Sequence, residues 1–383
     1  MVLAKIPLTA AAPLALWLVP VAEMGGVARH VLDVARAGLP GWRLVVLCPE
    51  GALAARLREL GSAVIAAPVG PSAGFAASVA TLRTNIKRVR PDVVHSHLAY
   101  ADVVAATAVL GLKTLLVTTE HGIAGNDTIY HGSGTRSKVK ALMHRIRLRR
   151  ADAVIAVSEA TRDTMLIKWR PKQPIAVIPN GVNAAAVRQQ VDALRTGHGS
   201  AEGEANRDLP GLKVLSLSRL SAEKRLDVLL RAFAMVRESE PHAQLTIAGE
   251  GPERESLELL AYRLGLSGSV DFVGFVDPFQ AMANSDLLVQ LSVWENCSYT
   301  LLDAVSAGLG VVATPVGGNP EILPTHCLVS ADDVPGISAS AIIQGARPDA
   351  RPVLPRAWPS TDEMAARLVD TYVAAGGSSD QAL

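Results

Sequence analysis

Two acidic residues stand eight positions apart in a segment that combines an apolar run, a polar loop and a helical pattern. The segment Ser292-Val-Trp-Glu-Asn-Cys-Ser-Tyr-Thr-Leu-Leu-Asp303 contains Glu295 and Asp303. Ser298 is a suitable N-cap for a helix that ends at Gly308. The first N–H groups of a helix, with its dipole, favour an anion such as a diphosphate. The segment therefore predicts an anion site beside Glu295, although two acids at this spacing also occur on solvated helix faces.

Two cationic side chains follow another apolar run. Arg219 and Lys224 lie in the segment Ser218-Arg-Leu-Ser-Ala-Glu-Lys224. A planar guanidinium and a compact ammonium can together stabilise the negative charge of a phosphate group without a metal. A solvated basic turn is the alternative interpretation.

Two glycine-containing turns also follow apolar runs. Gly25-Gly26 precedes a helical pattern, and Gly249-Glu250-Gly251 follows Gln244-Leu-Thr-Ile-Ala248. Glycine lets a backbone come close to a ligand, and amides at a helix start attract phosphate. A dinucleotide site is disfavoured because the G-x-G-x-x-G spacing is missing, although Glu50 stands where a ribose-binding acid would lie.

The elements that would position these residues are short apolar runs that alternate with helical stretches. This alternation is the pattern of parallel sheets whose two faces are covered by helices. We expect two doubly wound α/β domains, with the carboxyl edges of their sheets facing an interdomain cleft. The expected strands are 15–20, 43–48, 63–67, 93–96, 114–119, 153–156 and 175–178 in the first half, and 213–218, 244–248, 270–273, 287–291 and 310–313 in the second. Further helices are expected near 225–238, 253–265 and 299–307.

The stretch 192–211 is rich in Gly, Ala and charge, which indicates a linker. We therefore expect a first domain over 1–191, a linker over 192–211, a second domain over 212–345, and a tail over 346–383. After about residue 332 the chain is proline-rich, and the last expected element is an amphipathic helix from Asp362 to Ala374 that packs back on the first domain.

Histidines stand at the ends of two expected strands. His121 follows Thr118-Thr-Glu120, and His95 and His97 are one strand period apart, so they share a face. Two histidines on one face could suggest a metal, but no acidic or cysteine partner has suitable spacing. We expect structural roles for His95 and His97 and no bound metal or other cofactor.

Taken in order along the chain, these motifs resemble glycosyltransferase family 4 of the GT-B fold. The family signature is a Glu, seven residues and a second Glu, and this chain has Glu295, seven residues and Asp303. The Ser218-to-Lys224 segment resembles the family's Gly-Arg-Leu and Lys segment, and Val316-Gly-Gly-Asn-Pro-Glu321 resembles a later loop. The ordered resemblance covers residues 214–321, with further matches in the first half.

The resemblance implies that the domain over 1–191 is the acceptor side and that the domain over 212–345 binds the nucleotide sugar. It also implies roles for individual residues. Glu295 contacts the donor sugar, Asp303 holds the ribose, Arg219 and Lys224 bind the phosphates, and His121 reaches the sugar. The departures are Asp303 for Glu, Ser218 for Gly and Asn183 for Asp. The implied catalytic residues are Glu295, His121, Arg219 and Lys224, and the implied donor-binding residues are Gly25, Gly26, Arg219, Lys224, Gly249, Glu250, Glu295, Ser298, Tyr299, Thr300 and Asp303.

Composition excludes several classes of protein. Of the 383 residues, 49% are hydrophobic and 19% are charged, which argues against disorder, and a net charge of +1 gives no global attraction to nucleic acid. Cys48, Cys297 and Cys327 are too few for a disulfide framework or a zinc site, which fits a reducing compartment. Residues 8–21 are interrupted by prolines and fit a buried first strand better than a signal peptide.

The segment from Arg136 to Arg150 is a local basic patch with apolar residues, including Ile146, at near-helical spacing. Such a helix could contact anionic lipid or a lipid-linked acceptor, or pack on its own domain. We expect a cytoplasmic protein that can associate peripherally with the inner face of the plasma membrane.

The expected function is transfer, with retention of configuration, of a hexose-type sugar from a UDP-sugar or GDP-mannose to a hydroxyl of a glycan, lipid-linked or small-molecule acceptor. Cell-envelope or exopolysaccharide biosynthesis is the expected setting. Two alternatives remain: a non-catalytic nucleotide-sugar-binding protein, and another GT-B enzyme such as a nucleotide-sugar epimerase.

Overall fold

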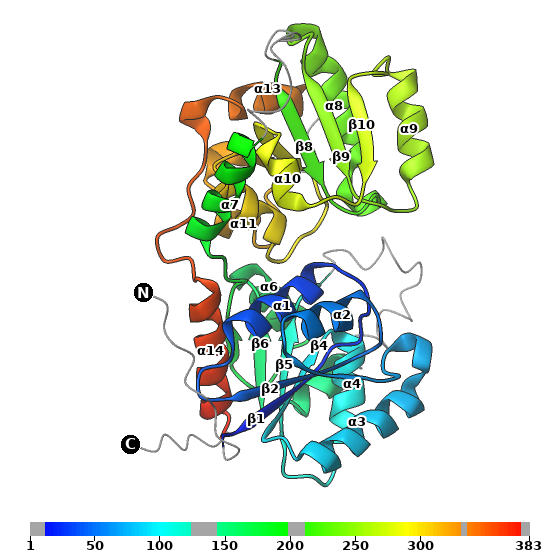
Figure 1. The fold of residues 1–383 in the computed structure, drawn as a ribbon, viewed down its shortest axis with the longest axis vertical. Coiled ribbons are helices and arrows are strands. Elements are labelled where there is room, and N and C mark those ends of the chain that lie inside the picture. The colour runs from blue at the N-terminus through cyan, green and yellow to red at the C-terminus, as the bar shows by residue number, and fades with distance from the viewer. Residues whose placement is uncertain (1–11, 124–143, 198–210, 331–334, 377–383) are drawn as a thin grey trace. The chain divides into compact units, whose positions relative to one another are not determined.

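The structure, a computed structural model, describes residues 12–123, 144–197, 211–330 and 335–376 (Figure 1). The chain divides into two compact units. Unit 1 comprises Met1–Gly181 and Pro359–Leu383, and unit 2 comprises Val182–Trp358. Each unit is built on its own parallel sheet.

Unit 1 contains a seven-stranded sheet in the order β3-β2-β1-β4-β5-β6-β7, with every neighbouring pair parallel. Its strands are β1 (Leu14–Leu18), β2 (Arg43–Cys48), β3 (Ala63–Ala66), β4 (Val93–His97), β5 (Leu115–Glu120), β6 (Ala153–Ala156) and β7 (Ile175–Val177). Its helices are α1 (Gly26–Ala37), α2 (Ala52–Glu59), α3 (Phe75–Val89), α4 (Ala99–Ala108), α6 (Glu159–Lys168) and α14 (Thr361–Ala374).

Both faces of this sheet are buried, which explains why its strands are nearly continuous apolar runs. Successive side chains point to opposite faces. Ala15 and Trp17 of β1 join a core with α1, α2 and α14, whereas Leu16 and Leu18 join a second core with α3 and α4. Figure 1 shows α14 beside α1, although more than three hundred residues separate them in the chain.

Unit 2 contains a five-stranded parallel sheet in the order β10-β9-β8-β11-β12. Its strands are β8 (Lys213–Leu217), β9 (Gln244–Ala248), β10 (Val270–Gly274), β11 (Leu287–Gln290) and β12 (Gly310–Ala313). Its helices are α7 (Ala184–Gly197), α8 (Leu226–Ser239), α9 (Arg254–Arg263), α10 (Pro278–Ala283), α11 (Tyr299–Ser306), α12 (Asn319–Ile322) and α13 (Pro335–Gly345). Helices α8, α9 and α13 bury one face of the sheet, and α7 packs against α10 and α11.

The predicted fold class, two parallel doubly wound sheets, is confirmed, and every predicted strand is present to within about two residues. In both sheets the strand order reverses beside the first strand, between β1 and β4 and between β8 and β11. Open α/β sheets bind ligands at the carboxyl ends of the strands at such a reversal. The loops after these four strands are therefore where functional residues are expected.

Two predictions about the path of the chain differ from the structure. The expected linker began at residue 192, but α7 continues to Gly197 and the division between the units falls at Gly181; residues 198–210 lie outside the described part. Helix α13 was not expected after residue 332. Pro335 is compatible with the first turn of this helix. Helix α13 packs on α8. No helix was predicted because the sequence of α13 does not alternate apolar and polar residues with a helical period.

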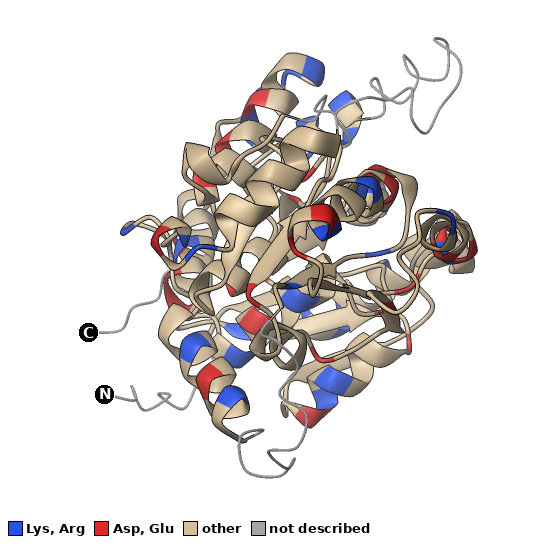
Figure 2. Ribbon diagram, turned by 90° about the horizontal axis from the view of Figure 1, so that it is seen from above, with Lys and Arg blue, Asp and Glu red and all other residues tan. Residues whose placement is uncertain are grey.

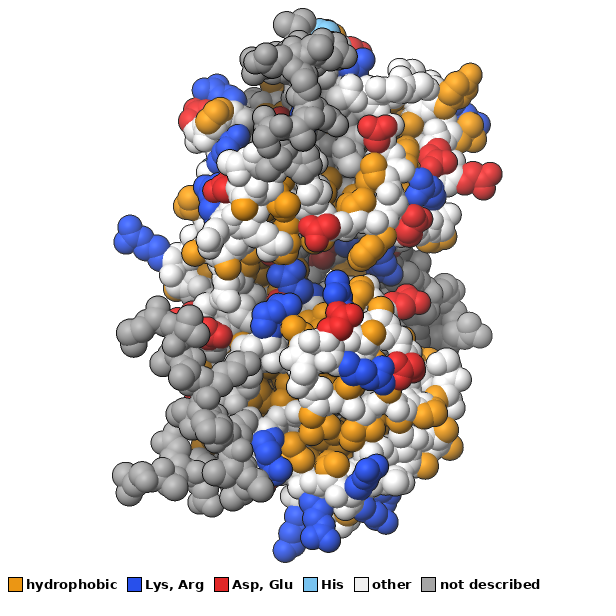
Figure 3. Space-filling view, viewed as in Figure 1, with side chains coloured by type: hydrophobic (Ala, Val, Ile, Leu, Met, Phe, Trp, Pro, Cys, Tyr) orange, Lys and Arg blue, Asp and Glu red, His pale blue; other side chains and the backbone are white. Residues whose placement is uncertain are grey.

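Among the described residues, no helix is both long and apolar enough to cross a bilayer. Acidic and basic residues are interspersed over the helices rather than separated by sign (Figure 2). Several of them form ion pairs three or four residues apart, such as Arg56 with Glu59 and Arg254 with Glu258. Figure 3 shows a group of hydrophobic side chains on the visible face of unit 1.

Candidate functional site

In unit 2, the loops after β8 and β11 bring together two of the predicted catalytic residues. Lys224 ends a short 3-10 turn (Ala222–Lys224) after β8, and Glu295 lies in the loop between β11 and α11. The Lys224 ammonium forms an ion pair with Oε1 of Glu295. Both side chains are about one-seventh exposed, at 14% and 13%. Strands β8 and β11 are neighbours, so the fold places a cation and a carboxylate together at the reversal of strand order.

The Glu295 carboxylate is held by two further donors. Gln290 Nε2 donates to Glu295 Oε1 at 2.6 Å, and Ser292 Oγ donates to the same oxygen at 2.8 Å. Ser298 Oγ in turn donates to Gln290 Oε1 at 3.1 Å, which fixes the orientation of the amide. Gln290 and Ser292 were not among the predicted site residues. A signal for both was available, because Gln290 is a polar residue at the carboxyl end of an otherwise apolar strand and Ser292 follows it by two positions.

Arg219 is also tethered, but by a different acid. Its guanidinium donates to Glu223 Oε1 at 2.8 Å while the side chain stays 70% exposed, and Ser221 Oγ donates to the same oxygen at 2.7 Å. The Glu223 side chain is only 4% exposed. The backbone N–H of Val293 donates to the carbonyl oxygen of Glu223, and this bond joins the turn that contains Lys224 to the loop that contains Glu295. Glu223 is thus a supporting residue that the sequence analysis missed.

Helix α11 begins as predicted. Ser298 is its N-cap, and the serine hydroxyl accepts a hydrogen bond from the N–H of Leu301 at 3.3 Å. Gly308 follows the end of the helix with a φ of +72°, a left-handed conformation that glycine favours. Tyr299, the first residue of α11, and Asp303 are buried, while Thr300 is partly exposed. The predicted anion site and ribose contact remain predictions.

The glycines of unit 2 permit close packing between loops. A Cβ at Gly249 would overlap the carbonyl oxygen of Ser218, and a Cβ at Gly251 would overlap that of Leu220. A Cβ at Gly317, where φ is +54°, would overlap the carbonyl oxygen of Glu295. The glycines expected to approach a ligand therefore bring the backbone of one loop against the next. The Glu250 side chain lies at the surface and pairs with Arg254.

In unit 1, the loop after β1 leads into α1 through Gly25 and Gly26. Gly25 is the N-cap position, with an extended backbone, and α1 begins at Gly26. A Cβ added to either glycine would meet no atom within 4 Å among the described residues. Within the part of the chain that the structure describes, these two glycines are therefore not in tight contact with another segment, in contrast to the packed glycines of unit 2.

His121 follows β5 and lies beside two other imidazoles of unit 1. Its Nε2 is 2.8 Å from Nδ1 of His97, the last residue of β4, and its ring packs edge-to-face on that of His30 in α1, with centroids 4.8 Å apart. Burial lowers the pKa of His30 to about 4 and places the pKa values of His97 and His121 well below the usual range. All three rings are therefore neutral at pH 7.

His95 has the structural role that was expected. Trp17 Nε1 can only donate, so the Tyr372 hydroxyl accepts a hydrogen bond from it at 2.9 Å and donates one to Nδ1 of His95 at 2.7 Å. His95 then donates from Nε2 to the hydroxyl of Thr119 at 2.7 Å. This chain joins α14 to β1, β4 and β5. A structural role was also expected for His97, but the structure shows in addition that its Nδ1 contacts His121.

The described part of the basic segment is helical over residues 144–149 and partly buried; residues 136–143 lie outside the description. Arg147 is 3% exposed and pairs with the carboxylates of Asp102 and Glu120. Burial lowers the pKa of the guanidinium and raises that of Glu120, because the surroundings of both groups disfavour their charged forms. Ile146, expected on the apolar side, is 54% exposed, whereas Leu148 is buried.

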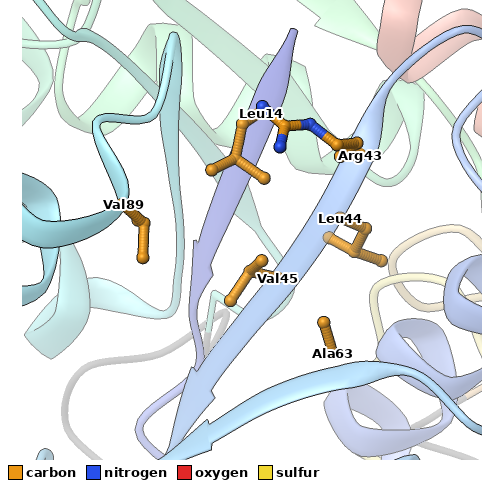
Figure 4. A pocket seen from close by; sticks show the side chains of 6 residues that line it. All are labelled: Leu14, Arg43, Leu44, Val45, Ala63 and Val89. Carbon is orange, nitrogen blue, oxygen red and sulfur yellow. The ribbon is translucent and has the colours of Figure 1, made fainter. Parts of the chain in front are cut away.

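A pocket in unit 1 lies away from these residues. It is lined by Leu14, Arg43, Leu44, Val45, Ala63 and Val89 (Figure 4). Leu14, Arg43 and Ala63 are the first residues of β1, β2 and β3, so the pocket borders the amino edge of the sheet. Ligands of open α/β sheets bind at the opposite edge, and we do not assign this pocket to the site.

Unit 2 thus joins Lys224 to Glu295 and ties Arg219 to the same group of loops, while unit 1 surrounds His121 with imidazoles. His30 was not singled out from the sequence. The signal available for it was a polar residue on the buried face of an amphipathic helix, one turn after Gly25 and Gly26.

Comparison with known proteins supports the assignment of this fold. Residues 24–186 match the family model "Glycosyltransferase Family 4", and residues 202–326 match the model "Glycosyl transferases group 1". The chain is 28% identical to the gpi3 subunit of phosphatidylinositol N-acetylglucosaminyltransferase from Schizosaccharomyces pombe, over 64% of this chain and 51% of the relative. It is 28% identical to alpha-monoglucosyldiacylglycerol synthase from Streptococcus pneumoniae, over 61% of this chain and 53% of the relative.

The chain therefore spans about half the length of these two relatives. Glycogen synthase from Mycobacterium tuberculosis is 28% identical over 85% of this chain and 83% of its own length. Among solved structures, Anabaena HepE in complex with UDP-glucose superposes with a TM-score of 0.72 at 22% identity, covering 94% of this chain and 96% of HepE. The two family models together match most of the chain and the solved structure shares its fold, so the chain belongs to glycosyltransferase family 4, with the GT-B fold.

Proposed function

We propose that this protein is a retaining glycosyltransferase that moves a hexose-type sugar from a nucleotide-sugar donor to an acceptor hydroxyl. The observation that carries the proposal is the Lys224–Glu295 pair at the reversal of strand order in unit 2. A carboxylate suits sugar hydroxyls, and a cation beside it suits the phosphate to which the sugar is attached. HepE, which shares the fold, was solved with UDP-glucose.

The proposed roles follow from the hydrogen bonds of unit 2. Gln290 and Ser292 hold the Glu295 carboxylate in place, so it can accept bonds from the sugar without reorganising. The Lys224 ammonium has three N–H groups and can keep Glu295 while it donates to a phosphate oxygen. Arg219, anchored through Glu223 but largely exposed, supplies a second cation to the departing diphosphate.

Asp303 is proposed to hold the ribose, and residues 298–300 at the start of α11 to contact the diphosphate. His121 is proposed as a neutral donor or acceptor toward the sugar, since burial keeps its pKa well below the usual range. The departing phosphate would help to remove the acceptor proton on the same face of the sugar. Charge stabilisation and orientation are then the protein's main contributions.

Nucleotide release tests the proposal. Purified protein is incubated with UDP-, GDP-, ADP- and TDP-sugars, with and without glycan or lipid-linked acceptors from cell-envelope or exopolysaccharide assembly. We expect release from one donor, and loss of at least ~100-fold in Glu295→Ala and Lys224→Ala, because each removes a charge that the transition state requires. Glu258→Ala, on the exposed surface of α9, is the matched control. Donor binding without acceptor-dependent release would favour a non-catalytic binding protein instead.

We also propose peripheral contact with an anionic membrane through the exposed arginines of the basic segment. Arg145, Arg149 and Arg150 are exposed, whereas Arg147 is buried and committed to two carboxylates. Sedimentation with vesicles that contain phosphatidylglycerol should fall in the variant Arg149→Glu but not in Lys113→Glu, which alters an exposed cation elsewhere in unit 1. Equal sedimentation of the two variants would refute this contact.

A further inference from the structure

Three histidines of unit 1 meet at the carboxyl edge of its sheet, from three different elements. His30 comes from α1, His97 ends β4, and His121 follows β5. Each offers a ring nitrogen, and the three nitrogens lie within 4.8 Å of one another. His30 and His97 are 1% and 0% exposed, while His121 is partly exposed and gives the group an open side.

The hydrogen bonds determine where the lone pairs are. The side-chain oxygen of Asn180 can only accept, and it lies 3.2 Å from Nδ1 of His30, so the His30 proton is on Nδ1 and Nε2 carries a lone pair. That Nε2 is buried and has no hydrogen-bond partner among the described residues. Buried polar atoms without partners cost about 1–3 kcal/mol each and are rare in native proteins.

Burial also keeps the three rings neutral. The pKa of His30 is lowered to about 4, and those of His97 and His121 lie well below the usual range, chiefly through desolvation. Neutral imidazoles are the form that binds metal ions, and the protons that compete for their lone pairs are absent at pH 7. His95, by contrast, has both ring nitrogens committed to Tyr372 and Thr119 and takes no part.

We propose that His30, His97 and His121 form a binding site for a divalent transition metal ion of the zinc class. The ion replaces the hydrogen between Nδ1 of His97 and Nε2 of His121, which are 2.8 Å apart. That hydrogen moves to the other nitrogen of the ring that carries it, so all three ligands stay neutral and no proton is released. The sequence analysis expected no metal here because it considered only His95 and His97.

The required rearrangement is small. Zinc bound to imidazole at about 2.0–2.1 Å places tetrahedral nitrogens roughly 3.3 Å apart. The largest separation of 4.8 Å must therefore shrink by about 1.5 Å, which side-chain rotation of the partly exposed His121 can supply. Asn180 acts as the partner that orients a metal-bound histidine through its other ring nitrogen. Three protein ligands leave a fourth position for water or another ligand, as in open zinc sites.

Occupation of the site has a consequence that rests on the proposed function. An ion that holds His121 withdraws it from the donor sugar, so zinc should compete with the nucleotide-sugar. Binding itself does not depend on catalysis. It can be measured when neither donor nor acceptor is present.

The test uses the full chain, stripped of metal with a chelator and titrated with ZnCl2 in a calorimeter. We expect one zinc ion per chain, and more than ~10-fold weaker binding in His30→Phe and in His121→Ala, since even partners of metal ligands contribute 10-fold or more. His242→Ala and His326→Ala, which remove exposed histidines of unit 2, should bind zinc as the unaltered chain does. Circular dichroism confirms that each variant is folded.

Absence of stoichiometric zinc binding to the unaltered chain would overturn the proposal. So would binding that is unchanged in both His30→Phe and His121→Ala, because zinc would then be held elsewhere, for example at a cysteine. A chain that binds zinc but releases no nucleotide from any donor would refute the proposed function and leave the metal site standing.

Discussion

The Tyr372 hydroxyl joins the last helix of the chain to the first strand, and its removal should destabilise unit 1 strongly. Tyr372 is fully buried on α14. Its hydroxyl accepts a hydrogen bond from Trp17 Nε1 at 2.9 Å and donates one to His95 Nδ1 at 2.7 Å. The substitution Tyr372→Phe removes one oxygen atom and keeps the ring that packs against Trp42.

The expected cost follows from the two partners that the substitution leaves behind. Trp17 Nε1–H and His95 Nδ1 would be buried with no hydrogen bond to each other or to the new ring. Each such group costs about 1–3 kcal/mol, so the free energy of unfolding of unit 1 should fall by about 2–6 kcal/mol. A unit of this size loses about 2–4 °C in Tm for each kcal/mol, which gives a decrease of at least ~4 °C.

Differential scanning calorimetry measures this effect. The protein has two units, so the transition of unit 1 is identified by hydrogen exchange of β4 and α14 measured in parallel. Tyr262→Phe is the matched control, because that tyrosine is 72% exposed on α9 of unit 2 and should leave both transitions in place. A change of less than ~0.5 kcal/mol in unit 1 for Tyr372→Phe would refute the account of this buried hydroxyl.

Three further predictions follow. Arg147→Met should destabilise unit 1 by about 3–5 kcal/mol because it leaves the buried acidic side chains of Asp102 and Glu120 without the arginine that pairs with them. Arg149→Met, at the exposed surface, should change the free energy of urea unfolding by less than ~0.5 kcal/mol, and equal effects of the two substitutions would contradict the buried pairing. Burial lowers the pKa of His30 from 6.5 to about 4. Between pH 6.5 and pH 4 the unfolded chain therefore binds a proton at His30 that the folded chain does not bind. The contribution of His30 to the free energy of unfolding should fall by about 3 kcal/mol as the pH drops from 7 to 4. The other buried histidines act in the same direction, and Glu120 and Asp33, whose pKa values burial raises, act in the opposite one. The change in urea midpoint between pH 7 and pH 5 is therefore compared with that of His30→Phe, and the same change in both proteins would exclude the effect. Gly317→Ala should reduce nucleotide release by ~100-fold with little loss of unit 1 stability, because the added Cβ would displace the backbone of Glu295. Unchanged nucleotide release would show that the contact between Gly317 and Glu295 does not position the Glu295 carboxylate.

The sequence alone was sufficient for the architecture of both units. Parallel strands buried on both faces must be short apolar runs, and the helices between them must be longer amphipathic stretches, so the alternation is visible without any tertiary contact. Functional loops follow strands because open α/β sheets bind ligands at the carboxyl edge. This is why local patterns and their order could predict that Arg219, Lys224 and Glu295 lie in loops after strands and that Ser298 caps a helix, while their roles toward a donor stay predictions. Helix α13 was missed because its local sequence gives only a weak helical signal, and the helix is stabilised by its packing on α8.

The partners of those residues were decided only by the tertiary structure. Lys224 and Glu295 are 71 residues apart, Tyr372 and Trp17 are 355 apart, and Arg147 reaches two carboxylates of other elements. Whether an arginine in a basic stretch lies in water or in a buried ion pair, and whether a histidine at a strand end stands alone or among other imidazoles, depends on strand order and helix packing. Local sequence sets the hydrophobic pattern of an element, but the burial and charge environment of a side chain come from segments distant in the chain, and for this protein those distant segments determine the chemistry of each site.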